Sequence, residues 1–404
     1  VLRAICAELR REGLKGSIWL GSKTPEDEAM VEEYLQLIAA DLPLELRIVR
    51  QSASGKRNAI ADILKCMARE GLGQNHFVAF MDSDFILFPG ALRRALPLFA
   101  RDPELHAVTT DEECVVKGPQ WIRSWLNMRF AQRRIGMMSH ALSDRVLTLT
   151  GRFSIFRTTH ILEPDFIETV QNDRLRHWLW GEFKFLSGDD KSTWYALLRL
   201  GVRMAYVPDA TGYTLESIEG SGVKRMTENL LRWSGNMLRN GARAIALGPR
   251  RMPFFIWWCL VDQRLAMWTM LFGPAAAIVG TFAYGPWFLV SFLIYVALTR
   301  LMMSIILWSH SSSVDFNYVW CLYANQLLNA AVKIFVLWRL PRQRWMNRGD
   351  QRAGFAGGGV AATLRQGMAG YLTVLSVGFL LFAAFLAVSS TGVTATTLRM
   401  MLNL

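Results

Sequence analysis

The chain has 404 residues, of which 52% are hydrophobic, and its 45 lysines and arginines against 33 aspartates and glutamates give a net charge of +12. This length exceeds that of an ordinary single domain, so we expect at least two structural parts. A basic chain suits a nucleic acid, an anionic membrane surface or an acidic substrate. Because the arginines gather beside apolar segments and no nucleic-acid-binding motif accompanies them, we expect membrane lipid as a partner and no nucleic acid.

Helices and strands are predicted to alternate through the first part of the chain. Such alternation predicts an α/β fold with a mostly parallel sheet that helices cover on both faces. Because Val1 is not a methionine and the first predicted helix follows it directly, we expect the natural chain to begin further upstream. The predicted elements are a helix at 2–12, a strand at 17–20, a helix at 25–40, a strand at 44–49, a helix at 58–69 and a strand at 76–81.

The pattern continues with a strand at 106–109, a helix at 121–138, a turn at 150–153, a helix at 191–200 and a strand at 203–207. Beyond Pro253, long apolar runs replace this mixed sequence. We therefore divide the chain into a cytoplasmic globular domain (1–224), amphipathic interfacial helices (225–264), a transmembrane hairpin with one further helix (265–338), a basic cytoplasmic loop (339–370) and a C-terminal transmembrane helix with its tail (371–404).

Four apolar stretches are near the roughly 20 residues that span a bilayer as a helix, and they lie at 265–283, 286–309, 316–338 and 371–389. If the globular domain is cytoplasmic, the first two stretches form a hairpin. The basic run 339–352 should then also be cytoplasmic by the positive-inside rule, which leaves the third stretch no crossing. Because that stretch contains several asparagines and a lysine, we expect it to be an interfacial or re-entrant helix.

Two acidic residues follow the strand predicted at 76–81. Asp82 and Asp84 are two residues apart on extended chain, which directs both carboxylates to one side. This arrangement suits a hard divalent cation and the diphosphate that it neutralises, although two aspartates in a surface turn are the alternative. Lys56, in the segment GKRN, precedes a helix at a place where backbone amides and a cation can meet an anion; the alternative is a solvated basic turn.

Two further motifs carry groups suited to chemistry. Asp189 and Asp190, in SGDDK, lie before a helix, and Asp190 is our candidate general base with Asp189 in support. Capping of that helix is the alternative role. Arg232 and Trp233, in NLLRW, precede the membrane region and can bind a pyrophosphate and stack on a sugar ring. The alternative for this pair is anchoring at the membrane interface.

The order GKRNA, FMDSD, SGDDK and LLRW, followed by apolar helices, resembles the processive family 2 glycosyltransferases, the group of cellulose, chitin, hyaluronan and alginate synthases. The resemblance implies a GT-A type fold and an inverting, metal-dependent sugar transfer from a nucleotide donor. It implies these roles: Asp84 and Asp82 as ligands of Mg²⁺ (or Mn²⁺), Lys56, Asp82 and Arg232 at the donor nucleotide, Asp190 as the base with Asp189 beside it, and Trp233 at the acceptor.

Several segments are similar to the catalytic subunits of alginate (mannuronan) synthases within that group, and they lie at 129–134, 145–152 and 183–192. This resemblance implies polymerisation of β-1,4-linked mannuronate from GDP-mannuronate at the bacterial inner membrane. It also implies a cyclic-di-GMP-binding co-polymerase subunit as the activating partner. A uronate donor adds a carboxylate, for which Lys191, Arg152 and Lys184 are candidate partners.

Two features depart from the family pattern. Asn229 replaces the glutamine of Q-x-x-R-W, which weakens the case for a side-chain contact at that position. The acidic element at the end of the family's first strand is absent. The basic segment 340–345 lies where related synthases carry a gating loop, so we expect it to cover the donor pocket. The alternative is that it serves only as a positive-inside anchor. A synthase of another β-linked polymer, a carrier-lipid glycosyltransferase and a non-catalytic membrane scaffold are the alternative functions.

Overall fold

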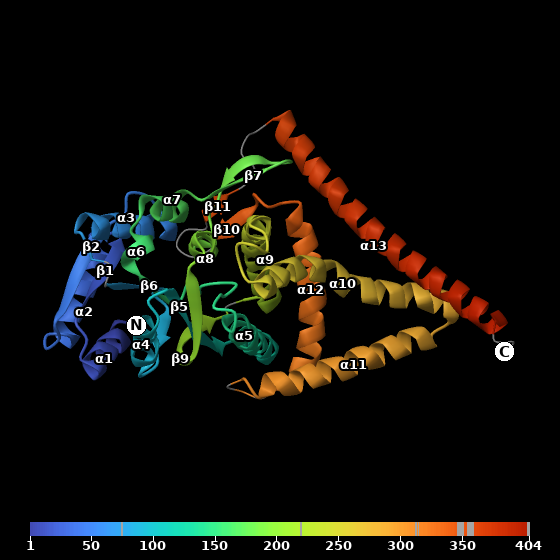
Figure 1. The fold of residues 1–404 in the computed structure, drawn as a ribbon, viewed down its shortest axis with the longest axis horizontal. Helices are drawn as coiled ribbons and strands as arrows, with labels where there is room; N and C mark the ends of the chain where they lie inside the picture. The colour runs from blue at the N-terminus through green and yellow to red at the C-terminus, as the bar shows by residue number, and fades with distance from the viewer. Residues whose placement is uncertain are drawn as a thin grey trace.

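The computed structural model describes residues 1–73, 76–218, 220–311, 313, 315–345, 351–353 and 359–401. Figure 1 shows an α/β region built from the first half of the chain and a set of long helices that extend away from it. This arrangement confirms the predicted α/β fold followed by membrane-type helices.

A small parallel sheet opens the chain. Its strands β1 and β2 pair in parallel from Gly16 with Leu44 to Ser22 with Arg50. The connecting helix begins where Thr24 accepts a hydrogen bond from the Asp27 amide, a side-chain cap that satisfies one of the free amides of the first turn. The elements here are α1 (Leu2–Glu12), β1 (Gly16–Ser22), α2 (Pro25–Ile38), β2 (Leu44–Arg50) and α3 (Lys56–Arg69), each close to its predicted range.

A five-stranded sheet forms the centre of the α/β region, in the order β3-β6-β5-β9-β4. The ladder between β5 and β9 is parallel, but β6 runs antiparallel to both β3 and β5, and β4 runs antiparallel to β9. The sheet is therefore mixed, and our expectation of a mostly parallel sheet was wrong for it. Short buried strands such as β6 carry no directional signal in their sequence. The strands are β3 (Phe77–Met81), β4 (Phe85–Leu87), β5 (Leu105–Lys117), β6 (Phe153–Arg157) and β9 (Arg203–Ser217).

Helices cover this sheet on both faces and bury separate apolar clusters. Leu64, Val170 and Trp194 lie in the cluster that holds α3, α7 and α8 together. Phe85 and Phe99 lie in a second cluster beneath α4. The remaining elements of this half are α4 (Ala91–Arg101), α5 (Gln120–Ala141), α6 (Thr158–Ile161), α7 (Pro164–Asn172), β7 (Arg174–His177), β8 (Gly181–Lys184) and α8 (Asp189–Leu200).

The second half of the chain is helical. Its helices are α9 (Gly222–Ala246), α10 (Phe254–Tyr284), α11 (Trp287–Trp308), α12 (Tyr318–Leu337) and α13 (Val360–Met401). Within the described residues, α10, α11, α12 and α13 are long and apolar enough to cross a membrane. In Figure 1, α10 and α11 converge into a hairpin whose tip approaches α13, whereas α12 runs across the base of that hairpin. Besides α10 and α11, α12 contacts α5 and α9.

The basic loop predicted at 339–370 is described in part. It contains a small antiparallel pair, β10 (Gln343–Trp345) and β11 (Gln351–Ala353). Residues 346–350 and 354–358 of the predicted loop lie outside the described residues.

Candidate active site

A cavity of about 1350 Å³ lies where the strands of the α/β region end, with α9 and the segment after α12 on its other walls. Residues from distant parts of the chain line it, so the motifs singled out in the sequence lie in one place. Their chemical roles remain predictions. The predicted site residues on its wall are Lys56, Asp82, Asp84, Arg152, Lys184, Asp189, Asp190, Lys191, Arg232 and Trp233.

Lys56 joins the two acidic motifs. Its ammonium lies 2.6 Å from an Asp82 carboxylate oxygen and 2.9 Å from one of Asp189, and it donates a hydrogen bond of 3.2 Å to the Gly151 carbonyl. Burial disfavours its charge, but the Asp189 and Asp82 carboxylates outweigh burial and raise the pKa of Lys56 above its usual value. Lys56 is therefore a fixed cation at the centre of the cavity.

Asp189 and Asp190 form the first turn of α8, which begins after Gly188 in a left-handed conformation (φ +82°). Burial opposes ionisation of Asp189, but the charges of Lys56 and Arg57 outweigh it and lower the pKa of Asp189. Burial, and then the charge of Asp189, raise the pKa of Asp190. Two adjacent carboxylates thus have separated pKa values, the arrangement that a base beside a permanent anion requires.

Gly151 lies against this charged cluster. A Cβ atom there would lie 3.4 Å from Lys56 Nζ and 3.4 Å from Asp190 Cβ. A side chain at this position would therefore occupy the space between the cation and the candidate base. The sequence marked this residue only as part of a turn.

A buried arginine supports the backbone in front of the acidic pair. Arg57 donates to the Ser187 carbonyl at 3.1 Å, to Ser192 Oγ at 2.9 Å and to the Val170 carbonyl at 2.9 Å. It thereby ties the start of α3 to the start of α8. The sequence placed Arg57 in a basic turn, and nothing local indicated that its side chain points inward.

Asp82 and Asp84 follow β3 and offer carboxylate oxygens at the cavity wall. Burial raises the pKa of Asp82, and the ion pair with Lys56 opposes that effect. No three His, Cys, Asp or Glu side chains of the described residues form a metal-binding group. Mg²⁺ is commonly held by only one or two carboxylates, with substrate phosphates and water as its other ligands. Asp84 and Asp82 fit such a donor set.

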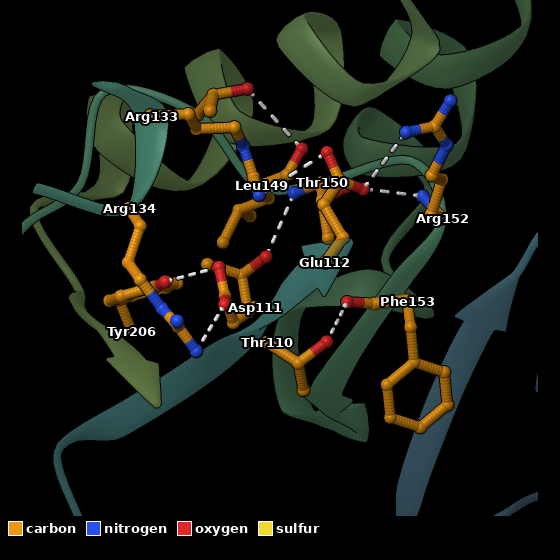
Figure 2. A network of polar contacts seen from close by, with 12 residues as sticks. Thr110, Asp111, Glu112, Arg133, Arg134, Leu149, Thr150, Arg152, Phe153 and Tyr206 are labelled. Carbon is orange, nitrogen blue, oxygen red and sulfur yellow. Dashed lines mark hydrogen bonds and ion pairs between the residues drawn. The ribbon is translucent and has the colours of Figure 1, made fainter. Parts of the chain in front are cut away.

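A network of acids and arginines lies behind these residues, and its members Glu112, Arg133 and Arg152 line the cavity. In Figure 2, Tyr206 and Arg134 converge on Asp111, with contacts of 2.6 and 2.8 Å. Glu112 lies 3.2 Å from Arg133 and 3.5 Å from Arg152. Burial opposes ionisation of Glu112, but these two arginines outweigh it and lower the pKa of Glu112.

The Arg-Trp motif lies on α9 and faces the same cavity. Arg232 donates a hydrogen bond of 3.3 Å to the side-chain oxygen of Asn229. Asn229 therefore contacts the arginine of its own motif. The ring of Trp233 is half-buried and stacks at 6.1 Å on Trp125.

The three candidate partners of a uronate carboxylate all contact protein acceptors. Lys184 donates to Asn172 at 2.6 Å, and Lys191 donates to the Leu147 carbonyl. Arg152 lies 3.5 Å from a Glu112 oxygen and 3.5 Å from one of Glu216.

The segment after α12 reaches the acidic motif. Gln343 accepts hydrogen bonds from the Leu186 and Ser187 amides at 2.9 and 3.4 Å and donates to the Lys184 carbonyl at 3.0 Å. Arg344 lies 3.1 Å from Glu228 on α9. The sequence placed this segment near the donor pocket without identifying Gln343 as the residue that docks it.

Comparisons with known proteins find similar sequences. The profile of a family described as "Glycosyltransferase like family 2" matches residues 9–236. The chain is 38% identical to glycosyltransferase alg8 of Pseudomonas syringae pv. tomato over 346 residues. This alignment covers 85% of this chain and 70% of that protein. Glycosyltransferase alg8 of Azotobacter vinelandii is 39% identical over 322 residues, which cover 79% of this chain and 65% of that protein.

Proposed function

This chain belongs to glycosyltransferase family 2, and from that premise we propose that it polymerises β-1,4-linked mannuronate from GDP-mannuronate to make an alginate precursor. It is a glycosyltransferase with helices able to span a membrane. Both relatives carry the name alg8, which supports an alginate-type product over another β-linked polymer such as cellulose, chitin or hyaluronan.

One observation carries the proposal. Lys56 lies within 2.9 Å of both acidic motifs, and the same cavity contains Asp190 and Trp233. A fixed cation, a carboxylate with raised pKa and an aromatic face are the groups that sugar transfer from a nucleotide diphosphate requires.

The chemistry follows from these groups. Asp190 takes the proton of the acceptor hydroxyl while that oxygen bonds to the anomeric carbon of the donor. The bond from this carbon to the diphosphate breaks on the opposite face, GDP leaves with the electron pair, and an α-linked donor gives a β-linked product. Lys56 and Arg232 contact the donor diphosphate. Asp84 and Asp82 would hold Mg²⁺ (or Mn²⁺), which supplies charge neutralisation for the leaving diphosphate.

We also propose a location, a partner subunit and a contact for the donor carboxylate. The catalytic domain is cytoplasmic, the helices lie in the bacterial inner membrane, and a cyclic-di-GMP-binding co-polymerase subunit activates the enzyme. Lys191, Arg152 or Lys184 recognises the donor carboxylate, for which each offers donors at the cavity wall.

A direct assay tests the function. Membranes that contain the full-length protein and its partner subunit are incubated with labelled GDP-mannuronate, and in parallel with labelled GDP-mannose and UDP-glucose. We expect a long labelled product from GDP-mannuronate alone, and we expect a mannuronate-specific lyase to degrade it. A polymer formed from a neutral donor would contradict the proposed substrate.

The same assay separates the other functions. A product of one sugar on a lipid would indicate a carrier-lipid glycosyltransferase. Absence of metal-dependent GDP binding by the purified protein would favour a non-catalytic scaffold.

A further inference from the structure

Arg129, on α5, lines the cavity. Its guanidinium lies 4.6 Å from the centre of the Trp233 ring and 5.4 Å from that of Trp125. The two indole rings stack at 6.1 Å with an angle of 23° between their planes. Because Trp233 is the expected acceptor contact, Arg129 lies on the acceptor side of the cavity.

Among the described residues, no carboxylate pairs with Arg129. Its hydrogen bond of 3.0 Å goes to the neutral side-chain oxygen of Asn325, which also accepts one of 2.9 Å from Trp125. Burial lowers the pKa of Arg129 to about 10, so the group is a cation at neutral pH. By contrast, Arg133 and Arg152 share Glu112. A half-buried cation without a carboxylate partner keeps part of its desolvation cost, which favours an anion from outside the chain.

Helix α12 continues this polar environment. Asn325, Asn329 and Lys333 are spaced by four residues, which places them along one face of the helix. Asn329 accepts a hydrogen bond of 3.2 Å from Ser234 on α9. Lys333 lies close enough to Arg129 for their charges to interact. Arg129 itself lines the cavity, and these α12 side chains give it a polar backing.

We infer that Arg129 binds a carboxylate of the growing polysaccharide on the acceptor side and so selects an acidic polymer over a neutral one. The inference rests on the proposed function, because a polyuronate offers one carboxylate per sugar. The guanidinium has five N–H donors in a planar fork that matches a carboxylate. The two indole rings and Asn325 hold this fork in place before the polymer arrives.

Binding of oligosaccharides to the full-length protein in detergent tests the inference without the donor. We expect the wild type to bind short β-1,4-mannuronate oligosaccharides ~10- to 100-fold more tightly than the uncharged β-1,4-mannose oligosaccharides, the range expected for charge-assisted hydrogen bonds. Arg129→Gln should remove this preference while neutral oligosaccharides bind as before, and Arg129→Lys should keep part of it. Arg123→Gln, on an exposed part of the same helix, is the matched control and should behave as wild type.

An Arg129→Gln protein with the wild-type preference for acidic oligosaccharides would overturn the inference. GDP binding and the melting temperature show whether this variant folds. If it does not fold, a salt titration of the wild type decides the matter, because affinity for the acidic oligosaccharide must fall with ionic strength more steeply than affinity for the neutral one. Equal salt dependence would also overturn the inference.

The two proposals fail separately. The proposed function fails if wild-type membranes make no polymer from GDP-mannuronate, whatever the oligosaccharides do. The present inference fails if polymer is made but Arg129→Gln leaves the acidic preference intact.

Discussion

At the scale of single residues, Asp189 and Asp190 have different environments and are therefore suited to different chemical roles. Asp189 pairs with Lys56 at 2.9 Å, whereas Asp190 lies beside that anion and has a raised pKa. An acceptor proton is therefore better taken by Asp190.

Replacing the candidate base tests this assignment. Asp190→Asn should lower kcat by about 100- to 10,000-fold, the usual contribution of a general base. GDP binding should remain near that of the wild type, because Lys56 and Asp82 still form their pair. Asp165→Asn, in the exposed first turn of α7, is the matched control. Near-normal polymerisation by purified Asp190→Asn would remove this residue from the role.

The pH profile follows from the same pair. Asp190 acts only when ionised, and its raised pKa places the acidic limb of kcat above the usual range of an aspartate. Asp189→Asn removes the neighbouring negative charge, which lowers the pKa of Asp190 and should shift the acidic limb to lower pH. The overall rate should also fall because Lys56 loses a partner. Measuring kcat through the acidic range checks the shift, and a limb that moves to higher pH would contradict it.

Motif chemistry singled out Lys56, Asp82 and Asp190 in the sequence, because each stands in a short pattern with a local meaning, and the structure places all three on one cavity. Their mutual contacts were not predictable. Lys56 meets the carbonyl of Gly151, 95 positions later, and Gln343 meets Leu186 across 157 positions. Pairings over such separations are decided by the fold, and no local pattern encodes them.

At the scale of elements, the apolar patterns predicted β1, β2 and β3 near their observed bounds but missed β4 (Phe85–Leu87), which is too short to show a pattern. The prediction ended β5 at residue 109, whereas the strand continues to Lys117. Its continuation contains Asp111 and Glu112, which resemble a loop in sequence. Arginines of α5 neutralise these acids inside the fold, so a polar stretch can remain a buried strand.

Two glycines that cap α8 allow a controlled test of how this helix positions the acids. Gly188 has φ +82°, and a Cβ there would lie 2.7 Å from the side chain of Asn236. Gly201 has φ +73° with open space around it. In both Ala variants the free energy of unfolding should fall by roughly 1–2 kcal/mol, because alanine is disfavoured in the left-handed conformation. Only Gly188→Ala adds the clash, and it immediately precedes Asp189.

We therefore expect Gly188→Ala to lower both the melting temperature and kcat. Gly201→Ala should lower the melting temperature by less and leave kcat unchanged. Thermal unfolding and initial rates on the two purified proteins check this difference. Equal kcat values in the two variants would show that the start of α8 does not control the acidic pair.

At the scale of the whole molecule, α12 is bound to the catalytic region at both ends. At its start, Gln120 of α5 donates to Asp315 at 3.0 Å. Near its middle, Trp125 of the same helix donates to Asn325 at 2.9 Å. Beyond its end, Gln343 accepts from the Leu186 amide. A helix with both ends on one domain runs along that domain, which favours the predicted interfacial or re-entrant placement although its length and hydropathy would allow a crossing.

Labelling of single cysteines tests this topology in a background that lacks the five native cysteines. Phe316→Cys and Val360→Cys stand before and after α12, at side chains that are 80% and 77% exposed, and Trp287→Cys stands near the tip of the α10–α11 hairpin. If α12 does not cross, an impermeant maleimide should label positions 316 and 360 in inside-out vesicles and position 287 in right-side-out vesicles. A permeant maleimide should label all three in both preparations. Opposite sidedness of positions 316 and 360 would mean that α12 crosses, and the contacts at its two ends would then have to break in the membrane.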